Sequence, residues 1–144
     1  MKRIQIKWFK TYNILICAIL SALGFSMSAC RAPDEYGTPS ADYIVQGKVT
    51  DSETDHPIKN IQVDMKWEKI LTDTEGKYKI VINYESTGSQ TFPIRFQDVD
   101  GDLNGSYMDL DTIVEFKDPK FTGGKGWYEG KTTKEFNIQL NPKE

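Results

Sequence analysis

Oxygen-bearing side chains gather between residues 98 and 111, in a spacing that suits a calcium ion. The pattern places acidic or amide oxygens first, third and fifth, a glycine sixth and a carboxylate twelfth: Asp100, Asp102, Asn104, Gly105 and Asp111. Calcium prefers several hard oxygen ligands around a sharp turn. The closing residue is the shorter aspartate rather than glutamate, and both flanks alternate like strands. The stretch is therefore either a calcium site or an acidic inter-strand turn, which uses the same residue types.

A second candidate site is the glycine-rich stretch from Phe121 to Gly130, which carries the adjacent aromatic residues Trp127 and Tyr128. Two aromatic rings at a flexible tip can stack on a sugar or a peptide. The alternative is that Trp127 packs onto the edge of the fold while Tyr128 faces water. The glycines do not indicate a phosphate loop, because no helix is expected after them.

Residues suited to catalysis are scarce. The only histidine, His56, lies in an Asp-His-Pro turn, and no serine stands in a nucleophile-elbow pattern. The sequence has no cysteine and histidine cluster with zinc spacing. We therefore expect a protein that is not an enzyme.

Cys30 divides the chain. Small residues precede it in Ser28-Ala29-Cys30, and the only other cysteine is Cys17, inside the apolar run of the N-terminal segment. A disulfide within the mature chain is therefore not expected if that segment is removed. The motif resembles the lipobox of bacterial lipoproteins, although Met27 replaces the usual aliphatic residue. The resemblance implies that Cys30 carries fatty-acyl chains such as palmitate and becomes the new N-terminus.

Residues 1–29 have the three-part pattern of an export signal, with a basic start, an apolar run from Ile14 to Phe25 and a small-residue exit. The run is shorter than the roughly 20 residues that a transmembrane helix needs, which is the alternative interpretation. By analogy with lipoprotein sorting, Arg31 after the cysteine favours the outer membrane. We expect a lipid-anchored protein of the bacterial cell envelope.

Composition restricts the partners of the mature chain. Loss of residues 1–29 removes four positive charges and changes the formal net charge from −3 to −7. An acidic chain without clustered basic residues is not expected to bind nucleic acid. The residues from Cys30 onward are enough for one domain with a modest core.

Residues 30–41 are rich in proline and polar residues, which predicts an extended tether. The segment Tyr36-Gly37-x-Pro39 after the anchor cysteine resembles small bacterial lipoproteins encoded beside a radical SAM enzyme. The resemblance implies such an enzyme as partner, and Tyr36, Gly37 and Pro39 as a segment that it could modify. The alternative is that these residues only stiffen the tether.

Residues 42–144 alternate apolar and polar positions with a period of two, which predicts strands with one buried face. Apolar positions recur in five runs: 43–49, 61–67, 78–84, 92–96 and 136–140. Turn residues separate most of them, so an all-β, antiparallel two-sheet sandwich is expected.

Four elements recur in the order of a known β-sandwich. They are Gly47-x-Val49-x-Asp51, Pro57-Ile58, Ile61-x-Val63 and Thr72-Asp73-x-x-Gly76-x-Tyr78. The order resembles the carboxypeptidase regulatory-like (transthyretin-like) domain, in which Pro57 would open the second strand and Gly76 would allow a turn with positive φ.

Two functions follow as expectations. The first is an anchored, non-catalytic interaction module for an envelope protein or glycan. The second is a protein substrate that a radical SAM enzyme modifies in the tether. Fold alone does not choose between them.

Overall fold

The computed structural model describes residues 12, 14–16, 18–19 and 37–144. The chain separates into two units, Met1–Tyr36 and Gly37–Glu144. The described residues of the first unit are helical. Among the described residues, no helix is both long and apolar enough to cross a membrane.

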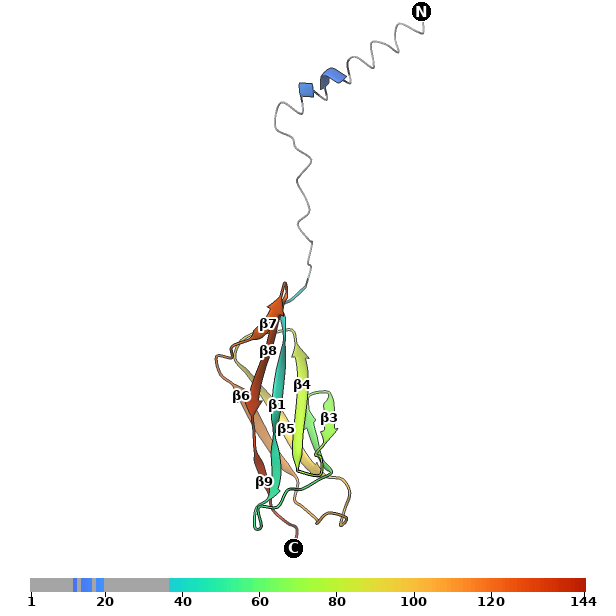
Figure 1. The fold of residues 1–144 in the computed structure, drawn as a ribbon, viewed down its shortest axis with the longest axis vertical. Coiled ribbons are helices and arrows are strands. Elements are labelled where there is room, and N and C mark those ends of the chain that lie inside the picture. Colours follow the sequence, from blue (N-terminus) through green and yellow to red (C-terminus); the bar gives the residue numbers. More distant parts are fainter. Residues whose placement is uncertain (1–11, 13, 17, 20–36) are drawn as a thin grey trace, which may run out of the picture. The chain divides into compact units, whose positions relative to one another are not determined.

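The second unit is built from strands alone (Figure 1). Their bounds are β1 Ser40–Asp51, β2 Ile61–Met65, β3 Glu68–Leu71, β4 Lys77–Tyr84, β5 Gln90–Asp98, β6 Leu110–Phe116, β7 Thr122–Lys125, β8 Tyr128–Glu135 and β9 Ile138–Leu140. They form two sheets with a shared hydrophobic core, which confirms the predicted all-β sandwich.

Strand β1 is the centre of the first sheet. It pairs antiparallel with β4 on one side and parallel with β8 and β9 on the other, while β7 pairs antiparallel with β8. The second sheet has the order β3-β2-β5-β6 and is antiparallel throughout. The expectation of antiparallel pairing therefore holds for the second sheet, and the first sheet is mixed.

Alternation along the strands places the core residues as the sequence predicts. The inward side chains are at most 2 % exposed at Tyr43, Val45, Val49, Ile61, Val63, Met65, Ile80, Ile82, Phe92, Ile94 and Phe96. Each such aliphatic or aromatic side chain contributes about 1.5–3 kcal/mol by leaving water. Tyr43 lies at the centre of an aromatic cluster, edge-to-face with Phe92 at 5.2 Å and with Phe116 at 5.1 Å between ring centroids.

The prediction that Trp67 continues the buried face of β2 is wrong. Met65 pairs with Glu68, so Lys66 and Trp67 form a two-residue hairpin turn, and Trp67 is 59 % exposed. Lys66 has a φ of 59°, in the left-handed region that a hairpin turn of this length requires.

Of the roles predicted for Gly76 and Pro57 in the sandwich motif, the structure confirms the first and not the second. Gly76 has a φ of 70° and its carbonyl accepts a hydrogen bond from the Val49 amide, so its turn role is confirmed. Pro57 does not open β2, which begins at Ile61. It forms an isolated bridge with Thr50 instead.

The last strands meet β1 at a kink. Strand β8 ends at Glu135 and β9 begins at Ile138, and the Phe136 amide between them donates to the Gln46 carbonyl. The Tyr78 hydroxyl donates to the Phe136 carbonyl from the buried side. The Lys48 amide donates to Asn137 Oδ1 at 2.9 Å. The parallel strand beside β1 is thus fixed at its break by one backbone bond and two bonds that involve side chains.

Strand β1 begins at Ser40, and Ala41 is fully buried. These two residues, assigned to the tether by the sequence, therefore belong to the sheet.

Candidate binding surfaces

The predicted anchor and part of the predicted modification segment lie outside the described residues, since Cys30 and Tyr36 belong to neither described range. Gly37 is exposed, and no atom lies within 4 Å of where its Cβ would be. Pro39 is half-buried, next to the first residue of β1. A side chain at residue 37 would therefore meet no other part of the described chain.

The acidic stretch between β5 and β6 forms a turn held by amide groups. The Asp100 carboxylate accepts hydrogen bonds from the side-chain amides of Asn60, at 2.9 Å, and Asn104. These bonds, that from Asn60 first, lower the pKa of Asp100. Asp98 accepts a bond from the Tyr107 amide at 2.9 Å, while Asp102 is exposed. The carboxylate expected to start the calcium loop already has two donors.

Asp111, the predicted closing ligand, lies elsewhere. It is on β6 opposite Arg95, with 3.7 Å between Asp111 Oδ1 and Arg95 Nε, and Asp109 is 2.7 Å from the same guanidinium. The structure therefore brings Asp100 and Asn104 together but gives Asp111 a basic partner. In residues 37–144 no group of three acidic, histidine or cysteine side chains is placed to hold a metal ion. The calcium site stays a prediction.

The Arg95 pairs belong to a row of alternating charges across the second sheet. Lys69, Asp64, Arg95 and Asp111 stand opposite one another on β3, β2, β5 and β6. Lys69 Nζ is 2.7 Å from Asp64 Oδ2. Opposite charges in register favour this pairing, although pairs this exposed contribute at most about 1 kcal/mol each.

The glycine-rich stretch is a β-hairpin rather than a loop. Strands β7 and β8 flank a turn at Gly126 and Trp127, and Trp127 is 43 % exposed. Tyr128 is half-buried, and its hydroxyl donates to Asp42 Oδ2 at 2.8 Å, which raises the pKa of Tyr128. Trp127 therefore faces water and Tyr128 is tied to β1, the reverse of the packing alternative. The ligand site at Trp127 and Tyr128 stays a prediction.

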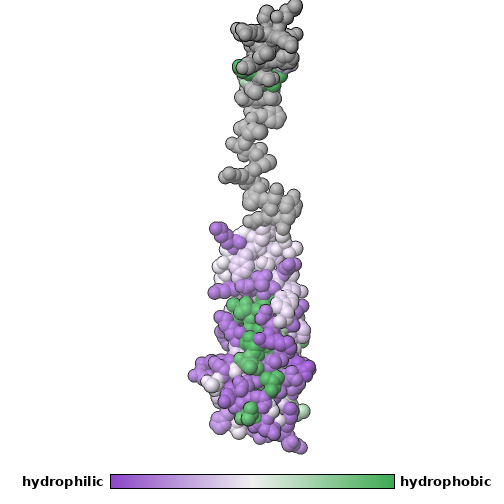
Figure 2. Space-filling model, turned by 90° about the vertical axis from the view of Figure 1, so that its right-hand side faces the viewer, coloured by the Kyte–Doolittle hydropathy of each residue, from purple (hydrophilic) through white to green (hydrophobic). Residues whose placement is uncertain are grey.

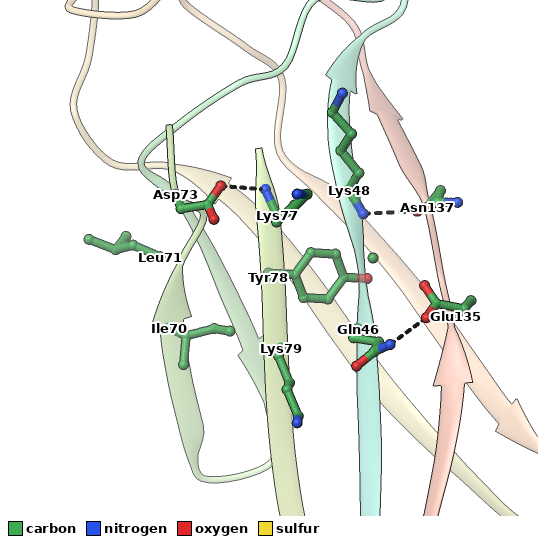
Figure 3. A pocket seen from close by; sticks show the side chains of 11 residues that line it. Gln46, Lys48, Ile70, Leu71, Asp73, Lys77, Tyr78, Lys79, Glu135 and Asn137 are labelled. Atoms are coloured by element: carbon green, nitrogen blue, oxygen red, sulfur yellow. Dashed lines mark hydrogen bonds between the residues drawn. The ribbon is translucent and has the colours of Figure 1, made fainter. Parts of the chain in front are cut away.

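A groove of about 740 Å³ crosses the outer face of the first sheet and continues to β3 (Figure 3). Lys48 stands opposite Lys77, and Gln46 opposite Lys79. Glu75 pairs with Lys77 and raises its pKa. Gln46 donates to Glu135, also on the groove wall. The groove mixes both charges with amides, so its lining favours no single charge of ligand.

The side of the sandwich formed by β3 and β4 carries a hydrophobic strip with a hydrophilic border (Figure 2). On these two strands Leu71 is 53 % exposed and Val81 is 41 % exposed. The lysines on β4 give this edge charge, a common protection against edge-to-edge pairing of sheets.

A smaller pocket of about 510 Å³ was not predicted from the sequence. It is lined by Trp67, Asn83, Tyr84, Glu85 and Ser86, from the β2–β3 turn and the end of β4. The one sequence feature that could have indicated this pocket is the pair Lys66-Trp67, which follows the alternating apolar and polar residues 61–65. The same pair is also compatible with a longer strand.

Asp51 and His56 lie near each other in the sequence, at the end of β1 and in the turn after it. His56 is exposed, and its carbonyl oxygen accepts a hydrogen bond from the Asp51 amide in the turn that follows β1. Asp51 is a nearly buried acid within the described residues, but its carboxylate serves the fold: it accepts from the amides of Glu53 and Thr54 and from the Tyr107 hydroxyl at 3.0 Å.

No protein-family model matches this chain, and no curated protein matches it.

Proposed function

We propose that this chain is a lipid-anchored protein of the bacterial cell envelope whose β-sandwich is a non-catalytic binding module. The observation that carries the proposal is the spacing between the anchor motif and the fold. Cys30 ends a signal-like segment, and β1 begins at Ser40. The nine residues between them are rich in proline and polar residues and reach about 30 Å when extended. With a lipid on Cys30, the sandwich could thus lie up to this distance from the membrane surface.

The surface of the sandwich offers two places where a ligand could bind. The groove over β1 and β4 and the pocket beside Trp67 are both open and polar at their rims. The order of motifs from Gly47 to Tyr78 resembles the carboxypeptidase regulatory-like domains, and this resemblance supports the role of an accessory module.

Acylation of Cys30 tests this proposal. Cells expressing the full chain are fed radiolabelled palmitate, and the labelled protein is followed through separation of inner and outer membranes. We expect label on the wild type and on Cys17→Ser, and none on Cys30→Ser. Equal labelling of Cys30→Ser, or recovery of unlabelled wild type in the soluble fraction, would refute the anchor.

A second function is that a radical SAM enzyme modifies the tether. The open surroundings of Gly37 favour it, because an enzyme must surround the residue that it modifies. The test is the intact mass of the protein from its own host, with mapping of the peptide from Tyr36 to Tyr43. We expect a radical SAM gene beside the gene of this chain, and a mass shift in the peptide that disappears when that gene is deleted. An unshifted peptide would leave the binding module as the function.

A further inference from the structure

We propose that Trp67 and Tyr84, with the polar groups beside them, form a saccharide-binding platform. This inference rests on the proposed role of the sandwich as a binding module and names the ligand class of one of its sites. Trp67 lies at the tip of the β2–β3 hairpin, 59 % exposed. Its ring is stacked on that of Tyr84, with 6.5 Å between centroids and 29° between planes. A large ring so exposed keeps aromatic surface available for a ligand.

The rim of the pocket is polar on the side of β4. Asn83, Glu85 and Ser86 line the same pocket as the two rings. The Asn83 side-chain nitrogen donates to Asp42 Oδ1 at 2.8 Å, which leaves the amide oxygen and the second amide hydrogen for a ligand. A carboxylate, an amide and a hydroxyl around an aromatic face match a pyranose ring, which has an apolar C–H face and hydroxyl groups at its edge.

The loop that carries the rim is fixed from the core. The hydroxyl of buried Tyr43 is shared between the carbonyl oxygens of Ser86, at 3.0 Å, and Gly88, at 2.8 Å. Gln90 donates to the Ser86 hydroxyl at 3.1 Å. A site held in place before binding loses less conformational freedom when its ligand arrives.

The turn that presents Trp67 is fixed as well. Lys66 adopts a positive φ, which is costly for a residue other than glycine or asparagine. Its ammonium lies 4.9 Å from the centre of the Tyr84 ring and 5.8 Å from that of Phe92. These cation–π contacts hold the turn in the conformation that places the indole beside Tyr84.

The chain offers a matched control for Trp67. Trp127 also occupies the second position of a two-residue hairpin turn whose first residue has positive φ, Gly126 at 64° and Lys66 at 59°. Trp127 is 43 % exposed and does not line the Trp67 pocket. Trp67→Ala and Trp127→Ala therefore remove the same side chain from equivalent turns.

The test is calorimetric titration of the full-length protein in a zwitterionic detergent, because detergents with sugar headgroups would compete. The probes are chitotetraose, cellotetraose, xylotetraose and maltotetraose, and a proline-rich peptide is titrated separately. We expect saturable binding of at least one tetrasaccharide. Trp67→Ala should weaken it by about tenfold or more, and by more than Trp127→Ala does. Thermal unfolding of both variants verifies that they are folded.

Three results would overturn the inference. They are no binding of any tetrasaccharide at millimolar concentration, equal binding by Trp67→Ala, and binding of the peptide alone with loss in Trp67→Ala. The acylation assay is independent of this titration. A labelled protein that binds no sugar refutes only the platform, and an unlabelled protein that binds sugar refutes only the anchor.

Discussion

The carbonyl oxygen of Phe136 lies 2.1 Å from where a Cβ on Gly47 would be. The kink between β8 and β9 thus approaches β1 at the one position of that strand without a side chain. Tyr78, which pairs with Gly47 on β4, reaches across to the same carbonyl. Glycine at residue 47 is a requirement of packing, in addition to any role in a sequence motif.

Gly47→Ala should therefore be strongly destabilising. The methyl group would meet backbone atoms, which cannot move without displacing β9, and overpacking of this kind costs about 1–3 kcal/mol or more. Chemical denaturation measures the change in the free energy of unfolding. Gly37→Ala is the control, because no atom lies near its Cβ position and we expect a change within about 0.5 kcal/mol. Equal effects of the two substitutions would contradict this account of Gly47.

The Tyr78 hydroxyl should make stability fall in alkaline solution. Burial, followed by the nearby Glu135 charge, raises the pKa of Tyr78 far above its usual value. Above about pH 10 the unfolded chain loses the phenolic proton while the folded protein keeps it, so stability decreases as pH rises. Tyr78→Phe should cost about 1 kcal/mol at neutral pH for the lost hydrogen bond. Its stability should also fall less steeply above pH 10, as measured by denaturation across pH. An identical alkaline slope in the variant would show that Tyr78 does not titrate as described.

Asp51 should contribute to the loss of folding stability in acidic solution. Hydrogen bonds from the Glu53 amide, then from the Thr54 amide, and from the Tyr107 hydroxyl, lower the pKa of Asp51. Near pH 4 the carboxylate of Asp51 takes up a proton in the unfolded chain but stays ionised in the folded protein. The stabilisation is therefore fully present above pH 4 and is lost as pH falls through the lowered pKa. Asp51→Asn keeps an acceptor oxygen but has no charge, and its stability should depend less on pH below 4. Thermal unfolding between pH 2 and pH 6 compares the two proteins, and parallel curves would rule out a contribution from Asp51.

The turn around Asp100 should keep its structure without metal. Two amide groups already donate to the carboxylate, so we expect the melting temperature to be the same in chelator and in calcium. Asp100→Ala should lower it, because both amides lose their acceptor. A ligand that binds only the native state must stabilise it. A melting temperature that falls on chelation and recovers with calcium would therefore establish the calcium site predicted from the spacing of Asp100 and Asp111.

The alternation of apolar and polar residues was sufficient to predict the strands whose side chains fill the core. Side chains such as Tyr43, Val63 and Ile80 follow the period of two because each strand has one wet face. Trp67 could not be assigned in this way, since its aromatic ring continues the period although the chain reverses at Lys66. Turns without glycine or asparagine give no local signal.

Pairing between distant strands was also beyond local patterns. The parallel partners of β1 lie in β8 and β9, and the glycines of β7 resemble a loop until the hairpin with β8 is seen. The Trp67 pocket combines a turn of the second sheet with the end of β4 in the first. A site assembled from both sheets depends on how they pack, which no run of residues specifies.

The mixed pairing of β1 has a consequence for how the protein folds. Tyr43 pairs with Thr132, so the central strand β1 cannot complete its pairing until residues almost ninety positions later in the chain are available. Contacts of such sequence separation slow folding, because the intervening chain must first be closed into a loop. An emerging chain with β1 to β6 already outside the ribosome still lacks half of its central pairing. If the chain is exported as we propose, this delay keeps it unfolded long enough to be threaded through a translocation channel, and the sandwich closes only after β8 and β9 have passed.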